Sequence, residues 1–290
     1  MWLEVAGATF WVANKIFETA TGKAADSLLN TIGHAIRGHG PEEGHIQGPP
    51  ERAFTSRFAT TPYDLDVVLR LRRAYFRHHL VSPDDSYRQC WRHNPRSMKI
   101  VSDLFGEPIG YWAVVPIAKE TFHRFIKGGD DGITHGEMLR DHAVAWSAVR
   151  PEEVRLYIIG AVVPVPAGRN QRENSLLQKM ISWRVLLDSF QFGIELMDRL
   201  TLRAVCGYPS RTGGYTTLDA MGFMKTKVCI AGDPKQPIFA MTCSRHLNRV
   251  RDRLGFFVRN HRNEVPVWDA RDRDQFFRQF GRADGNEAHW

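Results

Sequence analysis

A polar turn between an apolar strand and an amphipathic helix is the segment of this sequence best suited to chemistry. Residues 161–180 read AVVPVPAGRNQRENSLLQKM, where strand-like residues end in two prolines and a loop with Arg169 and Arg172 precedes Leu176 and Leu177. Turns of this kind commonly bind phosphate, because the first amides of a helix have no internal partner and the helix dipole favours an anion. The pattern therefore favours a phosphate site at this turn.

Composition and charge narrow the class of protein without naming a function. The chain has 290 residues, 43% hydrophobic and 24% charged, which is ordinary for a globular protein. Its net charge of +7 would suit nucleic acid, an anionic membrane or a phosphorylated cofactor. A compositional bias is the alternative and explains most of the excess, because Arg outnumbers Lys 30 to 9. Nucleic-acid binding is possible but not favoured, since no stretch interleaves aromatic and basic residues in a recognisable module.

Cysteine spacing and hydropathy predict a protein of the reducing cytoplasm. The four cysteines lie far apart without a CxxC pair, so we expect buried free thiols and no metal site; they are Cys90, Cys206, Cys229 and Cys243. No apolar run approaches the roughly 20 residues of a membrane span. The N-terminus lacks the basic start, clean apolar core and small-residue cleavage site of a signal peptide.

Residues 53–244 alternate strand and helix patterns, as in a mixed α/β domain. Strands are predicted at 54–60, in a hairpin over 99–117 that turns at Gly106, at 154–165, at 200–207, and in a final hairpin on either side of residues 233–236. Helices are predicted from Pro62 to Phe76 and at 84–93, 119–127, 176–190 and 212–221, the last ending at Gly222. The stretch 128–150 reads as a loop-rich insertion.

The two ends of the chain lie outside this pattern. Residues 1–37 predict a helical segment with a thin apolar seam, which suits packing on the domain, self-association or a protein partner. Residues 38–52 are rich in Gly and Pro and predict a linker. Residues 245–290 form an Arg-rich extension with ten Arg, no Lys and seven acidic residues. That extension can pack on the core or bind a partner, and its charge pattern does not decide between them.

The order of these elements resembles the GNAT superfamily of N-acyltransferases, and three motifs carry the resemblance. EPIGYWAVVP (107–116) is similar to the family hairpin in which a "G-x-x-x-G-Y" segment enters a strand. LDAMGFMKT (218–226) is similar to the "Y-x-K-L-G-F" end of the last helix, and VPVPAGRNQRENSLL (163–177) fits "V-x-P-x-x-[RQ]-x-x-G-x-[GA]-x-x-L-L" in register. The resemblance spans residues 53–244 and implies a twisted, mostly antiparallel central sheet of about six or seven strands, with helices on both faces.

The same resemblance implies acetyl-CoA, or another acyl-CoA, at the turn. In the family two Gly/Ala positions let backbone amides close around the pyrophosphate, and here those positions are Arg172 and Asn174. Asn tolerates left-handed backbone, so Asn174 is the milder change. Arg172 can itself bind phosphate through its guanidinium, beside Arg169. The alternative is a basic loop above a degenerate pocket.

In the family the preceding strand meets the pantetheine arm through backbone groups. Pro164 and Pro166 remove two donors there. The cofactor-binding residues that the resemblance implies are Val163, Val165, Arg169, Asn170, Gln171, Arg172, Glu173 and Asn174.

Amine acylation needs a base for the attacking nitrogen and an acid for the leaving sulfur. Leu218 occupies the position where many family members carry the tyrosine that protonates the thiolate, so Tyr215, one turn earlier, is the predicted acid. Glu153, just before the long strand, is the predicted base. The other candidate bases are Glu152, Tyr157, His135, Glu137, Asp141 and His142.

Two functions follow from these matches and departures. The first is an acyl-CoA-dependent N-acyltransferase that transfers acetyl from acetyl-CoA to an amine of unknown identity by direct attack. The alternative is a catalytically inactive GNAT-like domain that binds a ligand or partner and assembles through its terminal segments.

Overall fold

The computed structural model of the protein describes residues 54–76, 83–128, 132–163, 171–209, 218, 222–231 and 236–280, and for residues 171–177 and 179 it describes the backbone alone. The predicted N-terminal helical segment (1–37) and the linker (38–52) lie outside these residues. So do Val165, Arg169, Asn170 and Tyr215 of the predicted site.

A single mixed sheet of eight strands organises the described residues, in the order β6-β7-β5-β4-β3-β2-β1-β8. The strands are β1 (Thr55–Phe58), β2 (Met98–Ser102), β3 (Pro108–Pro116), β4 (Val154–Val162), β5 (Leu202–Gly207), β6 (Met224–Cys229), β7 (Pro237–Met241) and β8 (Val267–Trp268). Neighbouring strands are antiparallel except for the parallel pairs β1–β8 and β4–β5. The predicted α/β class with a mostly antiparallel sheet is confirmed.

The eighth strand was not predicted. β8 contains only Val267 and Trp268 and lies beside β1 at the end of the sheet. Two residues are too short for a period of two to show in the sequence. The strand forms because the chain after α9 returns to the open edge of β1, where Val267 N–H donates to the carbonyl of Phe54.

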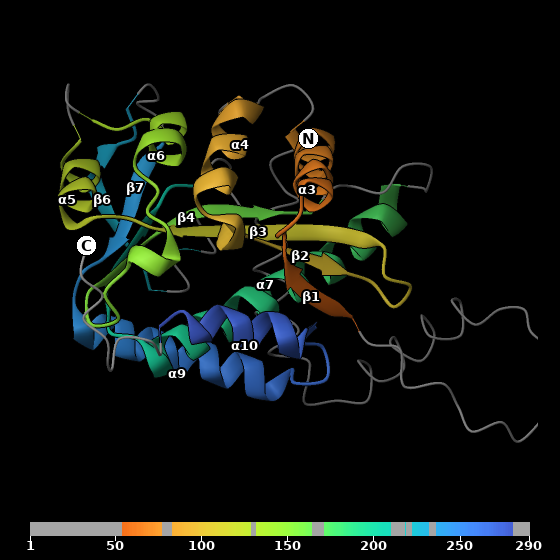
Figure 1. The fold of residues 1–290 in the computed structure, drawn as a ribbon. Coiled ribbons are helices and arrows are strands. Elements are labelled where there is room, and N and C mark those ends of the chain that lie inside the picture. Colours follow the sequence, from red (N-terminus) through yellow and green to blue (C-terminus); the bar gives the residue numbers. More distant parts are fainter. Residues whose placement is uncertain are drawn as a thin grey trace, which may run out of the picture.

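The helices form one layer on each face of the sheet (Figure 1). One layer holds α3 (Pro62–Phe76), α4 (Asp84–His93), α5 (Lys119–Lys127) and α6 (His135–Asp141), and the other holds α7 (Gln171–Arg199), α9 (Ser244–Asn260) and α10 (Ala270–Arg278). Along β3, Tyr111 and Ala113 pack in the core under the first layer, whereas Trp112 and Val114 pack in the core under the second. This alternation is the two-residue period of a strand buried on both faces.

The helix α7 is longer than predicted. The periodicity indicated residues 176–190, but the helix begins at Gln171 and runs to Arg199. It passes through Gly193, whose cost of about 1 kcal/mol relative to alanine in a helix is outweighed because Leu196 and Leu200 continue the buried face.

Residues 244–280 of the predicted C-terminal extension pack on the core, an outcome that their charge pattern left open. The helix α9 lies along α7, and Leu247, Val250 and Leu254 are buried there. On α10, the Asp272 carboxylate accepts hydrogen bonds from Phe58 N–H (2.8 Å) and the Trp268 indole (2.9 Å). The extension thereby covers the core under the second helix layer and lies against the edge of β1.

Gly110 permits the close approach of β3, β4 and α7. A Cβ at this position would lie 2.8 Å from the Val162 carbonyl oxygen and 2.9 Å from a Val185 methyl group. Gly110→Ala is therefore expected to lower the free energy of unfolding by about 1 to 3 kcal/mol through overpacking, as measured by urea unfolding. Gly193→Ala is the matched control, because its Cβ would meet only Leu254 at 3.7 Å. The control is expected to be neutral or to stabilise the helix by up to about 1 kcal/mol; equal effects of the two variants would contradict the prediction.

Candidate functional site

The edge of β4 that faces β5 loses its partner halfway along the strand. β4 and β5 pair in parallel from Val154↔Leu202 to Ile158↔Gly207, where β5 ends. β4 continues to Val162 and stays paired with β3 on its other edge. Among the described residues, no strand pairs with the β5-facing edge of β4 beyond Ile158. Backbone donors and acceptors on that edge are therefore available to a ligand.

A β-bulge reshapes β4 at the same place. In the pairing with β3, Ala113 lies opposite Gly160 and Val114 lies opposite Ile158, so Ile159 is the extra residue. Gly160 has a φ of +142°, a backbone conformation that side chains rarely allow. Bulges bend a strand and are common beside active sites. Here the bulge coincides with the end of the β4–β5 pairing.

Helix α7 contacts this end of β4 through Gln178, in its second turn. Val163 is buried after the last residue of the strand, and Gln178 Nε2 on α7 lies 3.3 Å from the Val163 carbonyl oxygen, to which it donates a hydrogen bond. Four predicted cofactor residues, Gln171, Arg172, Glu173 and Asn174, form the first helical turn rather than a loop. The first backbone amides of a helix have no partner within it. The turn can therefore offer amides to a phosphate without glycine at the positions of Arg172 and Asn174.

A buried polar cluster lies where β4 and β5 part. The α6 residue His135 is 5% exposed, and its Nδ1 lies 2.6 Å from the hydroxyl oxygen of Tyr157 on β4. Its Nε2 lies 3.4 Å from the hydroxyl oxygen of Tyr87 on α4. Tyr157 pairs with Cys206, one position before the last β4–β5 pair. The half-buried ring of Tyr208, just after β5, has its centroid 5.4 Å from that of His135.

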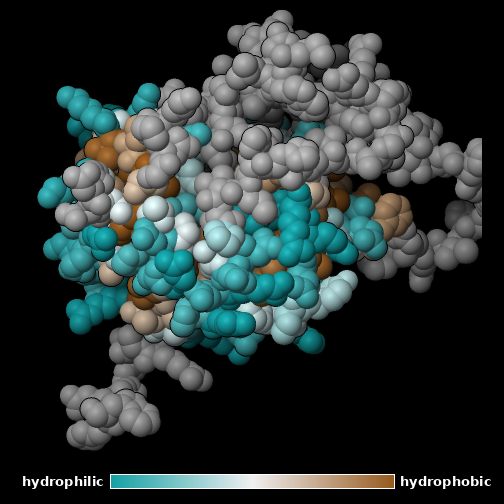
Figure 2. All heavy atoms as spheres, turned by 90° about the horizontal axis from the view of Figure 1, so that it is seen from above, coloured by the Kyte–Doolittle hydropathy of each residue, from teal (hydrophilic) through white to brown (hydrophobic). Residues whose placement is uncertain are grey.

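A capping box holds His135 in this place. The Thr134 side chain accepts from the backbone N–H of Glu137, whose carboxylate accepts from the backbone N–H of Thr134 at 2.8 Å. This reciprocal pair fixes the first turn of α6. Figure 2 looks onto the helix layer that includes α6, where the described surface is mostly hydrophilic with hydrophobic residues between.

Burial keeps this cluster uncharged. Desolvation, with a smaller contribution from the Arg72 guanidinium, lowers the pKa of His135 to about 3. Burial also raises the pKa of Tyr157 well above its usual range. Arg72 lies over the Tyr87 ring at 4.3 Å and pairs with Asp84 at 2.7 Å. Near neutral pH the cluster therefore offers a neutral imidazole and neutral hydroxyls for hydrogen bonding.

The structure separates the other predicted bases from the end of β4. Glu153 precedes β4 and is exposed, whereas Val163 follows the same nine-residue strand. The two residues therefore lie about 30 Å apart, and Glu153 cannot act on a ligand at the end of β4. Glu137 belongs to the capping box, and Asp141 pairs with exposed Arg140 at 2.9 Å.

Of the candidate bases, His135 and Tyr157 are the two that the described structure brings together. They lie 22 positions apart in the sequence, and no local pattern joins them.

The predicted acid position is only partly described. Leu218, which stands at the family's tyrosine position, is buried in the core under α7 and α9. Gly222 has a φ of +88°, and Phe223 N–H donates to the Leu218 carbonyl. This geometry fits the predicted helix end at Gly222.

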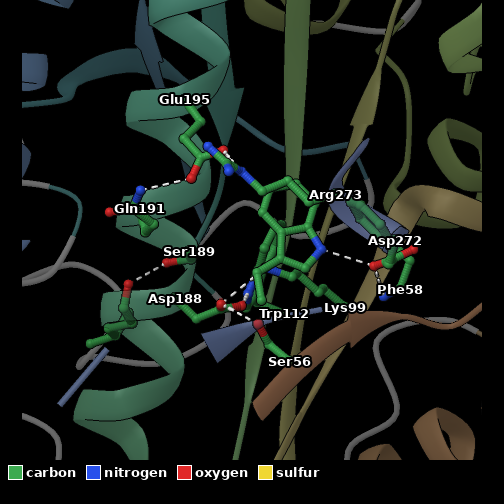
Figure 3. Close-up of polar contacts among 12 residues, drawn as sticks. Ser56, Phe58, Lys99, Trp112, Asp188, Ser189, Gln191, Glu195, Asp272 and Arg273 are labelled. Carbon is green, nitrogen blue, oxygen red and sulfur yellow. Dashed lines mark hydrogen bonds and ion pairs between the residues drawn. The ribbon is translucent and has the colours of Figure 1, made fainter. Parts of the chain in front are cut away.

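A second buried polar cluster lies on the other face of the sheet and is closed by its own contacts (Figure 3). One oxygen of Asp188 accepts from Ser56 at 2.6 Å and from Lys99 at 3.0 Å. Its other oxygen accepts from the Trp112 indole at 2.6 Å. Lys99 also lies 3.9 Å from the ring centroid of Trp268. Lys99 and Asp188 are each 1% exposed and pair with each other, so this cluster joins strands to α7.

All four cysteines are free, but the prediction that all are buried is wrong. Cys90 and Cys206 are buried, Cys229 is half-buried and Cys243 is exposed. Cys243 is exposed because it precedes α9 at the surface. In the part of the chain that the structure describes, no group of three or more His, Cys, Asp or Glu residues is arranged to hold a metal ion. The helices in that part include none with the length and hydropathy of a membrane span.

No family model matches the sequence, and no curated protein matches it. Solved structures do show similarity. A candidate acetyltransferase from Pyrococcus horikoshii is 13% identical at a TM-score of 0.35, over 63% of this chain and 48% of its own, so this chain spans about half its length. A chain of the NatC complex bound to Gag peptide and CoA is 12% identical at a TM-score of 0.39, over 66% of this chain and 99% of its own. A GNAT-family acetyltransferase from Listeria monocytogenes is 11% identical at a TM-score of 0.35, over 66% of this chain and 95% of its own. Similarities this weak identify no substrate or activity for this chain.

Proposed function

We propose that this protein is an acyl-CoA-dependent N-acyltransferase that transfers an acyl group, acetyl in the simplest case, to an amine. The observation that carries the proposal is the edge of β4 beyond Ile158, which no described strand pairs on the β5 side and which leads from the bulge at Gly160 to Val163, where Gln178 of α7 makes contact. The sequence from Val163 onward resembles the acyl-CoA motif of GNAT proteins, and Val163 directly follows this strand. The free cysteines suit the reducing cytoplasm, where we propose the reaction occurs.

Three parts of acyl-CoA match three parts of the site. The pyrophosphate suits the amides of Gln171–Asn174, with Arg172 as a further cation. The pantetheine amides suit the open backbone edge of β4 between Ile159 and Val163. The thioester would then lie near Ile158, beside Tyr157.

The transfer forms a carbon–nitrogen bond, breaks a carbon–sulfur bond and moves one proton from the amine nitrogen to the sulfur. Tyr157 is the side chain that we assign to this end of the site. Its hydroxyl oxygen lies 2.6 Å from Nδ1 of His135, and in the tautomer that carries a proton on Nδ1 the imidazole donates to this oxygen and leaves the hydroxyl proton for the ligand. A neutral hydroxyl can donate a hydrogen bond or relay a proton without first ionising.

The alternative, an inactive domain that binds a ligand or partner, has an observation of its own. Leu218 offers no proton, and its side chain is buried in the core. In this reading acyl-CoA or another phosphorylated ligand binds at the same edge without turnover.

Calorimetric titration of the full chain with acetyl-CoA and with CoA tests the proposal. We expect saturable binding that Arg172→Glu weakens tenfold or more, since the substitution puts a negative charge beside the phosphates. Arg150→Glu, an exposed arginine before β4, changes the net charge equally and is expected to leave binding unchanged. Binding with acceptor-dependent release of CoA supports the transferase, and binding without release on a panel of amines supports the alternative. If the unmodified chain binds neither acetyl-CoA nor CoA, or if both variants weaken binding equally, the assignment of this site is overturned.

A further inference from the structure

Positive charge is concentrated on one helix of this protein. Residues 244–262, which are α9 and the turn after it, contain six arginines and one aspartate, a net charge of +5. The whole chain carries +7. Residues 263–290, which follow directly, contain four arginines and six acidic residues. A uniform bias toward arginine would not leave neighbouring segments with opposite charge, so composition alone does not explain α9.

A second arginine-rich stretch has a lower density of positive charge than α9. Residues 54–100 also carry a net charge of +5, spread over a stretch more than twice as long. Four of its eight arginines form ion pairs with nearby carboxylates, which are Arg57–Asp64, Arg72–Asp84, Arg73–Asp84 and Arg88–Asp66. On α9, Arg251 forms an ion pair with Asp198 at the boundary with α7.

The arginines of α9 form a row on its exposed side. Leu247, Val250 and Leu254 are buried on the opposite side. Arg245, Arg249 and Arg253 follow one another at intervals of four residues and are exposed. Four residues of helix rise by about 6 Å, so the row spaces its charges evenly. Arg259 and Arg262, also exposed, continue the charge toward and beyond the helix end. We call these five residues the α9 arginine surface.

An exposed aromatic ring lies on the same helix. The Phe256 side chain is 43% exposed, three positions after Arg253. Residues three apart lie on one face of a helix. This face therefore interleaves arginines with an aromatic ring, an arrangement that the linear sequence does not show.

We propose that the α9 arginine surface binds the backbone of single-stranded nucleic acid. Evenly spaced guanidinium groups suit a chain of phosphates, which they bind through paired hydrogen bonds. An exposed ring gives one base a surface for stacking, which occurs with little sequence preference. An anionic membrane fits less well, because the apolar side of α9 is already buried against the core and cannot insert. The proposal does not depend on acyl-CoA binding, because none of the five arginines is among the residues assigned to acyl-CoA, although α7 and α9 share a helix layer (Figure 1).

The test measures binding of a labelled oligouridine of about 20 nucleotides to the full chain by fluorescence anisotropy over a series of salt concentrations. The test variant replaces four arginines of the surface by glutamine: Arg245→Gln, Arg249→Gln, Arg259→Gln and Arg262→Gln. The control variant replaces four exposed arginines elsewhere: Arg70→Gln, Arg92→Gln, Arg140→Gln and Arg150→Gln. Both variants have the same net charge and differ only in where it is removed. Circular dichroism and thermal unfolding confirm that each variant is folded.

We expect the test variant to bind at least tenfold more weakly at 0.1 M salt, and its log–log salt slope to be smaller by about 3, from four lost phosphate contacts on a single strand. The affinity of the control variant for the oligouridine is expected to remain within about twofold of that of the unmodified protein. A DNA oligonucleotide of the same length, run in parallel, shows whether the surface reads the 2′-hydroxyl. The proposal is overturned if the unmodified chain does not bind, if both variants weaken equally, or if anionic vesicles bind the chain and oligonucleotides do not.

Discussion

Replacing Asp188 by alanine is expected to lower the free energy of unfolding by about 3 to 5 kcal/mol. The carboxylate is 1% exposed and accepts hydrogen bonds from Ser56, Lys99 and Trp112. Without it, the Lys99 ammonium, also 1% exposed, stays in the core beside Trp268 and loses the carboxylate that it contacts directly. Burial already lowers the pKa of Lys99, and the nearby Asp188 carboxylate opposes that shift. Urea unfolding at neutral pH measures the change.

A double-mutant cycle with Lys99→Met separates the lost charge from lost packing. Once Lys99 no longer carries a charge, removal of Asp188 is expected to cost about 2 kcal/mol less than in the unmodified protein. Asp198→Ala is the matched control, because Asp198 also lies on α7 but pairs with Arg251 at the surface, where it is 41% exposed. Its cost is expected to stay below about 1 kcal/mol. Additive effects of Lys99→Met and Asp188→Ala would show that the two side chains are not coupled.

Acid is expected to destabilise the protein through His135. The pKa of this imidazole falls from 6.5 to about 3 on folding because the ring is buried beside Arg72. Between these values the unfolded chain binds a proton that the folded protein excludes. The contribution of His135 to stability is therefore complete above about pH 6.5 and is lost as the pH falls toward 3. The free energy of unfolding should fall from this cause by about 1.4 kcal/mol per pH unit, or about 3 kcal/mol between pH 6.5 and 4.

His135→Gln isolates this effect, because glutamine can still hydrogen-bond to Tyr157 but does not titrate. Urea unfolding between pH 4 and 7 is expected to show a pH slope shallower by about 1.4 kcal/mol per unit than in the unmodified protein. His123→Gln serves as the control, because this α5 histidine is exposed and its replacement is expected to leave the slope unchanged. An unchanged slope in His135→Gln would mean that the histidine does not exclude the proton in the folded state.

The sequence was sufficient where local interactions decide the structure. The hairpin turn predicted at Gly106 joins β2 to β3, and Gly106 has a φ of +83°, which favours glycine. The start of α3 after Thr61 is confirmed, and the Thr61 hydroxyl accepts from the backbone N–H of Asp64. Each of these features depends on residues within a few positions of one another, so their chemistry is visible in a short stretch of sequence.

The site was predicted in part. The sequence indicated a polar turn before a helix at the end of a strand, and α7 does follow β4 in the chain and contact its end through Gln178, whereas most of the turn lies outside the described residues. It placed the helix start at 176 rather than Gln171, because the polar residues 171–175 hide a first helical turn from any search for apolar periodicity. The base Glu153 was assigned because it is near the strand in sequence. It lies before the first residue of β4, however, and the candidate site lies at the other end of that strand.

By itself, the sequence determined the α/β class and the positions of most strands and helices. Alternation, helix starts and turn residues express local preferences, which act before distant parts of the chain meet. Tertiary structure alone decided that β4 and β5 part after Ile158, that His135 meets Tyr157 across 22 positions, and that Lys99 meets Asp188 across 89. These contacts form because burial makes a polar group costly unless it finds a partner, and the partner can come from any part of the chain that the fold brings near.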